Sequence, residues 1–133
     1  MIYLDHNATT PIDKEVADAM LPFIHENYGN PSSSYKIGTA SKKAVETARK
    51  QVAELISCSP DEIIFTSGGS ESNNTAIKGT AFTYKNRGNH IITSVIEHPS
   101  VLNPCGFLEK SGYQVTCLPV DKYGIINTDE LKK

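Results

Sequence analysis

The sequence predicts an α/β fold, namely a partial doubly wound, mainly parallel sheet flanked by helices. Three short runs rich in β-branched and aromatic residues, at 63–65, 90–96 and 113–118, are typical of buried strands. Segments with helical spacing of apolar residues separate these runs, and strands that alternate with helices form parallel sheets. We expect one incomplete domain over residues 1–133: an extended arm at 1–12, a helical segment at 13–57 and the start of the sheet at 58–133.

The helical segment contains two predicted helices. Pro11 and Asp13 introduce the first, and its apolar side chains follow one face: Val16, Met20, Phe23 and Ile24. The turn-forming residues 27–34 (NYGNPSSS) predict a loop. The second helix is longer, with a stripe of mostly small apolar residues that indicates close packing: Ile37, Ala40, Ala44, Ala48, Val52 and Leu55.

Shorter elements complete the prediction. Residues 59–62 (SPDE) resemble a capping box with proline at the first helical position, and we expect a single helical turn there. The strand at 63–65 stops at two glycines, after which Ser70 caps a helix with Ile77, Ala81 and Tyr84 on one face. A helix at 100–110 follows, limited in regularity by Pro104, and 123–124 form a turn. Thr128 caps a last helix whose first turns reach residue 133, so we expect the sequence to be cut within a domain.

Composition excludes several classes of function. The chain has 133 residues, 38% of them hydrophobic and 21% charged, and a net charge of −2, so it offers no basic surface for nucleic acid or anionic membranes. No apolar run approaches the length of a membrane span, and the first residues lack the features of a signal peptide. We therefore expect a cytoplasmic protein.

Cysteine and histidine spacing predicts no metal site. Cys58, Cys105 and Cys117 form an odd set without a C-x-x-C pair, so neither a disulfide framework nor structural zinc is expected. The four histidines are dispersed along the chain.

The glycine turn at 68–70 has the features of an anion site. A strand, a glycine turn and a helix start together present free N–H groups and the positive end of a helix dipole, to which a phosphate binds well. The alternative is structural, because glycine and serine also serve turns with positive φ and helix caps. Neither G-x-x-x-x-G-K-[ST] nor G-x-G-x-x-G after a strand is present, so the phosphate of a cofactor or small molecule fits better than that of a nucleotide.

His98 is the second candidate. Pro99 keeps it out of the α region, so His98 is predicted to stay extended after the strand at 90–96. Ligands of open α/β sheets bind beyond the carboxyl ends of the strands, where the imidazole could stack on an aromatic ligand whose phosphate occupies the glycine turn. The alternative is a histidine that only donates a hydrogen bond in a strand-to-helix loop.

Four segments together resemble the cysteine desulfurases of the class V aminotransferase family, fold type I enzymes that use pyridoxal 5'-phosphate. They are residues 3–11 (YLDHNATTP), 29–33 (GNPSS), 65–74 (FTSGGSESNN) and 97–98 (EH), in the family's order and at family-like separations. The resemblance runs along the whole chain but covers about the first third of a family member. It implies that the fold is the N-terminal part of the large domain of such a transferase, with residues 58–133 beginning the cofactor-binding sheet.

The resemblance also implies roles for single residues. Gly69 and Ser70 match positions that bind the cofactor phosphate, and His98 matches the histidine that stacks on the pyridine ring and assists proton transfer. Three residues match an N-terminal loop close to the substrate: Asn7, Ala8 and Thr9. Ser70 stands where many members have threonine, which keeps the hydroxyl group.

The resemblance implies the conversion of L-cysteine to L-alanine and an enzyme persulfide, whose sulfur goes to an acceptor such as an iron–sulfur scaffold protein or to thiolation pathways. The family forms homodimers. Its Schiff-base lysine and catalytic cysteine match nothing here and are expected beyond residue 133, so we expect the isolated chain to be inactive. Two alternatives stay open: a selenocysteine lyase or other class V aminotransferase, and a stand-alone binding module without catalysis.

Overall fold

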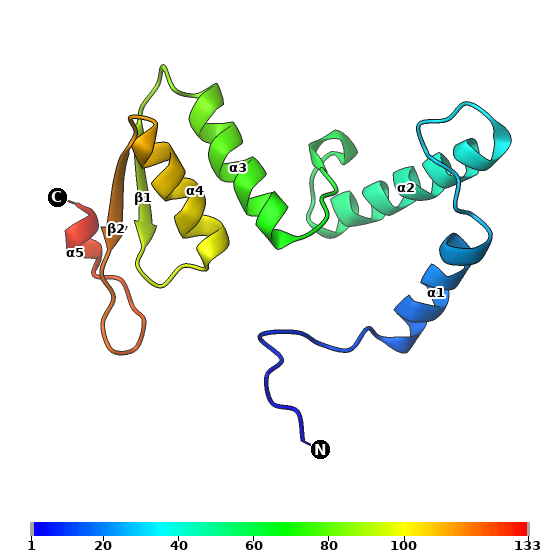
Figure 1. The fold of residues 1–133 in the computed structure, drawn as a ribbon, viewed down its shortest axis with the longest axis horizontal. Coiled ribbons are helices and arrows are strands. Elements are labelled where there is room, and N and C mark those ends of the chain that lie inside the picture. Colours follow the sequence, from blue (N-terminus) through cyan, green and yellow to red (C-terminus); the bar gives the residue numbers. More distant parts are fainter. Residues whose placement is uncertain (1, 133) are drawn as a thin grey trace. The chain divides into compact units, whose positions relative to one another are not determined.

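The computed structural model describes residues 2–132, and the chain divides into two compact units at residues 64 and 65. Figure 1 shows the order of the elements. Helices α1 and α2 and the short 3-10 helix η1 belong to the first unit, whereas the second unit contains three helices and a two-stranded sheet.

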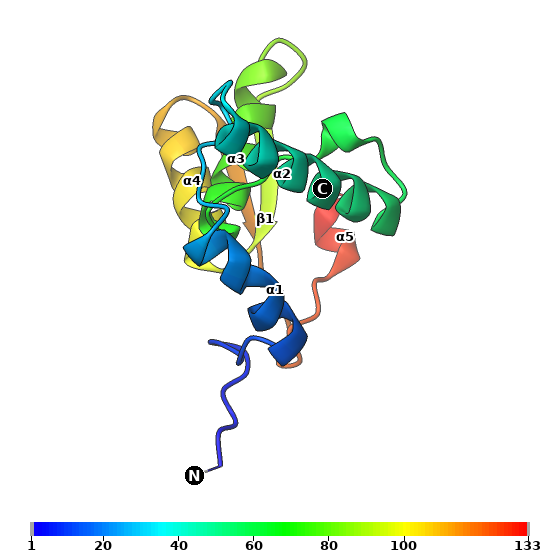
Figure 2. The same cartoon turned by 90° about the vertical axis from the view of Figure 1, so that its right-hand side faces the viewer.

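The first unit begins with an extended arm, followed by helix α1 (Lys14–His25). The arm, in blue, runs as an irregular chain in both views (Figures 1 and 2). Asp13 caps α1 by accepting a hydrogen bond from the Glu15 N–H at 2.9 Å, which satisfies one of the free donors at the helix start. Part of each predicted apolar face, on α1 and on α2 (Lys36–Leu55), lines one open groove of the first unit, with Met20, Phe23 and Ala44 in its wall.

The loop before α2 is held by close backbone contacts. A Cβ atom on Gly38 would lie 2.6 Å from the carbonyl oxygens of Asn30 and Ser33, so the loop packs against the helix where only glycine fits. The buried hydroxyl of Ser41 donates to the Asn27 carbonyl at 3.1 Å. These contacts fix the loop at residues 27–34 that its turn-forming residues predict.

Helix η1 (Pro60–Glu62) is the single turn that the SPDE sequence predicts. The Glu62 carboxylate accepts a hydrogen bond from the Ser59 N–H at 2.7 Å, as in a capping box. The Arg49 guanidinium on α2 donates to the Ile63 carbonyl oxygen and thereby ties the end of this turn to the long helix.

The second unit is a small α/β layer. Strands β1 (His90–Ser94) and β2 (Gln114–Leu118) pair in parallel, with His90 opposite Gln114 and Ser94 opposite Leu118. Helix α3 (Gly69–Thr83) precedes β1, and α4 (Pro99–Lys110) makes the crossover between the strands. Helices α3 and α4 pack along each other, and their N-terminal ends lie at the end of the sheet where β1 finishes (Figure 1). The predicted α/β class is therefore confirmed.

The core of the second unit lies between α4 and β2. Leu108 is fully buried, and Cys105, Tyr113 and Leu118 are buried around it. The Tyr113 hydroxyl donates to the Ala81 carbonyl at 2.8 Å, which joins the end of α3 to the start of β2. One side chain thus supplies both apolar packing and a satisfied buried polar group.

The strand predicted at 63–65 is wrong for this structure. Residues 63–66 are irregular, Ile64 is 72% exposed and Phe65 is 48% exposed. A strand requires a hydrogen-bonded neighbour, and the sheet of the described residues contains β1 and β2 alone. The apolar run therefore has the β propensity of a strand but lies outside this sheet.

Two predicted caps are also corrected. Helix α3 starts at Gly69 with Gly68 as its N-cap, so Ser70 lies inside the first turn instead of before it. The last helix, α5 (Thr128–Leu131), is capped by Asn127, whose side chain accepts from the Asp129 N–H at 2.9 Å, and Thr128 is its first residue. In α5 the side-chain oxygen of Asn127 lies two residues before the N–H group that it accepts, whereas the N-cap of α3 is a glycine without a side chain. Residue 133 lies outside the described residues.

Across residues 2–132, the structure contains no helix that combines the length and the apolar character needed to cross a membrane.

Candidate functional site

The start of α3 presents an uncapped helix end. Within the described residues no side chain caps it, and the first N–H of the helical ladder is that of Ser72, which donates to the Gly68 carbonyl at 3.1 Å. The N–H groups of residues 69–71 therefore precede the ladder and remain available to an acceptor. Helix dipole and N–H groups together make this end attractive to an anion.

The two glycines of this turn are not required by the surrounding protein. Gly68 is extended (φ 164°, ψ 177°), a conformation open to any residue. A Cβ atom on Gly68 or Gly69 would meet no atom of the described residues within 4 Å. The positive-φ explanation for these glycines is thus wrong, and the absence of side chains leaves open space directly at the amide groups.

Hydrogen bonds of neighbouring side chains hold the glycine turn in its conformation. The Thr66 hydroxyl donates to the Gly68 carbonyl at 3.2 Å and lies 2.7 Å from the Ser72 hydroxyl. Glu71 reaches back to residue 67, where its Oε2 accepts from the Ser67 N–H at 2.6 Å and from the Ser67 hydroxyl at 2.7 Å. The turn is thereby preorganised by the chain's own side chains.

The Ser67 contacts make the turn sensitive to acid. The hydrogen bond from the Ser67 hydroxyl, and after it that from the Ser67 N–H, lower the pKa of the Glu71 carboxyl from its ordinary value of 4.5. A lowered folded-state pKa contributes stability above the unfolded-state value, and that contribution is lost as pH falls through the folded-state pKa. We expect the Ser67 amide to lose its protection from hydrogen exchange as pH falls below about 4.5 and through the folded-state pKa of Glu71. In Glu71→Gln, which cannot titrate, the protection should be low and should show no carboxyl titration; an unchanged profile would contradict the assignment.

Ser70 lies exposed in the first turn of α3, and its carbonyl accepts from the Asn74 side chain at 2.9 Å. His98 is exposed and extended (φ −60°, ψ 148°), as the following proline predicts, and it is the N-cap of α4. Its Nδ1 accepts from the Ser100 N–H at 3.1 Å and lies 2.8 Å from the Ser100 hydroxyl. The imidazole is thus held at a helix start.

A hydrogen bond connects the two candidate positions. Asn73, one helical turn after Gly69, donates from Nδ2 to the Ser100 hydroxyl at 2.8 Å. The starts of α3 and α4 therefore lie together at one end of the second unit (Figure 1). His98 lies beyond the carboxyl end of a strand, as predicted, because it follows β1. The glycine turn does not, because within the described residues no strand precedes it.

Asn7, Ala8 and Thr9 belong to the first unit, where they are exposed. The Ala8 N–H donates to the Asp5 carbonyl at 3.0 Å, which closes a turn, and the Tyr3 hydroxyl donates to the same carbonyl at 2.8 Å. Their role near a substrate stays a prediction.

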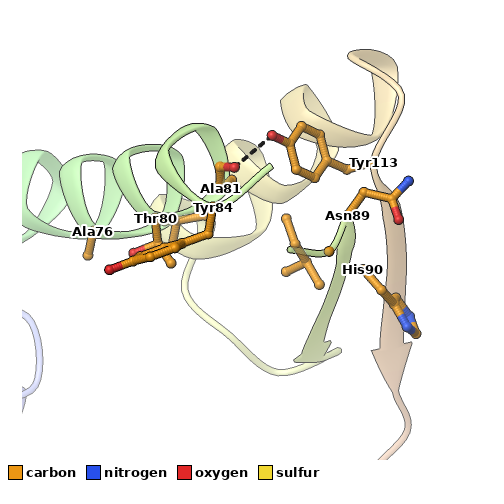
Figure 3. A pocket seen from close by; sticks show the side chains of 10 residues that line it. Ala76, Thr80, Ala81, Tyr84, Asn89, His90 and Tyr113 are labelled. Atoms are coloured by element: carbon orange, nitrogen blue, oxygen red, sulfur yellow. Dashed lines mark hydrogen bonds between the residues drawn. The ribbon is translucent and has the colours of Figure 1, made fainter. Parts of the chain in front are cut away.

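Sequence reasoning missed Asn73 and Ser100. Their signal is spacing: an asparagine one turn after the glycine pair, and a serine two residues after the histidine, where a hydroxyl can reach back to a cap. It also missed an open apolar groove of about 420 Å³ between the second half of α3 and the start of β1 (Figure 3). Tyr84, His90 and Tyr113 help to line this groove, which lies near the other end of α3 and shares no residue with the glycine turn.

The remaining cysteines and histidines form no metal centre. Within residues 2–132 no three or more His, Cys, Asp or Glu side chains gather in a way that could hold a metal ion. All three cysteines are free thiols, and burial raises the pKa of the Cys105 thiol.

The fold and the candidate site together define a parallel α/β unit in which an uncapped glycine turn starts one helix and a histidine caps the next. Comparison with known proteins gives the family: the model of the aminotransferase class-V family matches residues 2–133, and the chain belongs to that family. Its enzymes depend on pyridoxal phosphate.

The chain is similar to several cysteine desulfurases. It is 56% identical over 131 residues to cysteine desulfurase IscS of Methanosarcina thermophila, a match that covers 98% of this chain and 32% of the relative. It is 54% identical over 132 residues to the Homo sapiens cysteine desulfurase, covering 98% of this chain and 29% of the relative. The chain thus spans about a third of the length of the curated relatives that it matches.

Solved structures show the same fold. A NifS-like protein superposes with a TM-score of 0.91 at 40% identity, covering 98% of this chain and 36% of that protein. The structure of SspA in complex with cysteine gives a TM-score of 0.87 at 42% identity, covering 98% of this chain and 38% of SspA. The described architecture therefore matches the N-terminal portion of these proteins.

Proposed function

We propose that this chain is the phosphate-holding part of a pyridoxal phosphate-dependent cysteine desulfurase. The observation that carries the proposal is the uncapped start of α3, with two glycines whose missing side chains leave its amides open, joined by Asn73 and Ser100 to His98. A cofactor with a phosphate at one end and an aromatic ring at the other fits this pair of sites. High identity to several cysteine desulfurases supports the choice within the family.

Backbone N–H groups form the part of the site that would bind the phosphate. The N–H groups of residues 69–71 would donate to phosphate oxygens, and the Ser70 hydroxyl, in the same exposed turn, adds a further donor. Hydrogen bonds to a charged group contribute about 1.5–3 kcal/mol each when they are well formed. The acidic Glu71 does not compete for this position, because its carboxylate is turned back onto Ser67.

The ring end is His98. The imidazole is exposed, yet its orientation is fixed by two hydrogen bonds to Nδ1, so its planar face can cover an aromatic ring without losing a cap. When bound, pyridoxal phosphate supplies the electron withdrawal that weakens bonds at the substrate α-carbon. His98 would orient the ring and serve as the nearby proton-handling group.

One relative supports the choice of substrate, and the resemblance of the sequence to the cysteine desulfurases supports the choice of partners. SspA was solved in complex with cysteine, which supports L-cysteine as the substrate here. The whole enzyme would yield L-alanine and a persulfide, whose sulfur passes to an acceptor such as an iron–sulfur scaffold protein, and it would act as a homodimer. Asn7, Ala8 and Thr9 would lie near the bound substrate.

Titration with pyridoxal phosphate tests the proposal. We expect the 133-residue chain to bind it saturably and noncovalently, with competition by inorganic phosphate, and to release no sulfide from L-cysteine. Pyridoxal, which has the ring but no phosphate, is the matched control ligand and should bind at least about tenfold more weakly, since the helix end contributes through the phosphate. Equal affinity for the two ligands would exclude the phosphate site.

A further inference from the structure

We infer that Asn73 and Ser100 are positioning residues that hold His98 in a single neutral tautomer, with its proton on Nε2. His98 would then meet a ligand ring as a hydrogen-bond donor through Nε2–H, while Nδ1 is already occupied. The ligand side of this inference rests on the proposed function. The tautomer itself rests only on contacts within the second unit.

The direction of the first hydrogen bond is unambiguous. The Ser100 backbone nitrogen lies 3.1 Å from His98 Nδ1, and a backbone N–H can only donate. Nδ1 must therefore be an acceptor and carry no proton. In a neutral imidazole one nitrogen carries the proton, so it resides on Nε2.

The second hydrogen bond follows from the first. The Ser100 hydroxyl lies 2.8 Å from the same Nδ1, and because Nδ1 carries no proton, the hydroxyl must be the donor. Its lone pairs then remain for another donor, and the Asn73 amide supplies one at 2.8 Å. The three contacts form one directed series from Asn73 to Ser100 to His98.

The series is anchored on two helices. Asn73 and Ser100 are both half-buried, whereas His98 is exposed. Asn73 sits on α3, one turn after the glycine pair, and Ser100 sits in the first turn of α4, so their hydrogen bond couples the phosphate end of the site to the ring end. Partly buried hydrogen bonds between rigid elements hold an orientation better than exposed ones.

This arrangement has a chemical consequence. For Nδ1 to accept a proton, His98 would have to give up both hydrogen bonds and uncap α4. The accessible edge of the ring therefore carries a donor, Nε2–H. The three hydrogen bonds therefore determine that His98 would exchange protons through Nε2 and not through Nδ1.

Nitrogen NMR of the ¹⁵N-labelled 133-residue chain tests the inference. In mildly alkaline buffer we expect His98 Nδ1 to resonate as a pyridine-type nitrogen and Nε2 as a pyrrole-type nitrogen. We also expect a scalar coupling across the hydrogen bond from the Ser100 N–H to Nδ1. A protonated Nδ1, or no coupling, would overturn the inference.

Substitutions of Asn73 and Ser100 distinguish a role in positioning His98 from a role in folding alone. In Ser100→Ala and in Asn73→Ala, the Nδ1 resonance should move toward the position of a mixture of the two tautomers, and Ser100→Thr, which keeps the hydroxyl, should restore it. Asn74→Ala is the matched control, because Asn74 is half-buried on the same helix but donates to the Ser70 carbonyl instead. If Asn73→Ala matched Asn74→Ala, the series would have no role.

The same samples distinguish the two proposals. A fixed tautomer without binding of pyridoxal phosphate would overturn the proposed function and leave the role of Asn73 and Ser100 in place. Binding of pyridoxal phosphate with mixed tautomers would overturn this inference alone.

Discussion

Gly69→Ala should weaken binding of pyridoxal phosphate by about 10- to 100-fold, equivalent to about 1.5–3 kcal/mol for one displaced charge-assisted hydrogen bond. The Cα–Cβ bond of a helical residue tilts toward the N-terminus, so an alanine methyl group at this position would lean into the space in front of the free amides. That space is open in the structure, since a Cβ on Gly69 meets nothing within 4 Å. Equilibrium dialysis or fluorescence titration measures the effect.

Gly79→Ala is the control for this substitution. Gly79 lies on the same helix, and a Cβ there also meets nothing within 4 Å, but the residue is almost three turns away from the helix start. It should leave the affinity unchanged and raise helix stability by up to about 1 kcal/mol. Equal loss of affinity in the two variants would mean that the glycines act through helix stability and not through access to the amides.

Leu108→Ala should destabilise the second unit by about 2–5 kcal/mol, because a fully buried leucine leaves a cavity when it is truncated. Leu108 is the most completely buried of the apolar residues of this unit, which also include Cys105, Tyr113 and Leu118. Its carbonyl also accepts from the Tyr113 N–H at 3.1 Å, so loosening of α4 extends to the start of β2. Amide hydrogen exchange of β1 and β2 gives the change in opening free energy.

Leu131→Ala is the matched control in the same unit. Leu131 is 51% exposed on the short helix α5. The same change of side chain should cost well under about 1 kcal/mol there, since little apolar area returns to water. A similar cost at both positions would show that the packing around Leu108 does not stabilise the unit.

Elements with strong periodicity were predictable. The apolar faces of α1 and α2, the SPDE turn and the strand pair β1 and β2 all follow from local patterns. Helical spacing and turn residues act within a few positions of the chain, so the sequence contains the relevant information directly. The predicted start of α3 was two residues too late because Gly68 and Ser70 are both acceptable cap residues.

The run at 63–65 shows where local patterns fail. Its β-branched and aromatic residues have the composition of a strand, but a strand is defined by hydrogen bonds to a neighbouring strand, and the sheet of the described residues consists of β1 and β2. β propensity expresses how well a side chain packs on a pleated surface, and it has no effect where that surface is absent.

The candidate site was found in part. The glycine turn and His98 were recognised from a helix start and from the residue before a proline. The contact between these two positions was not predicted, because the hydrogen bond from Asn73 to Ser100 spans 27 residues and depends on how α3 packs against α4. The spacing of Asn73 and Ser100 marks each of them at its own helix start, but no local pattern indicates that the two side chains meet.

By itself the sequence determined the α/β class, the helical faces, and the turn and histidine that suit a phosphate and an aromatic ring. Those features depend on backbone preferences and on spacing within one or two helical turns. Only the tertiary structure decided that the starts of α3 and α4 meet and which nitrogen of His98 is an acceptor. The physical reason is that hydrogen-bond direction depends on atoms brought together by packing, and packing unites residues that are distant in the chain.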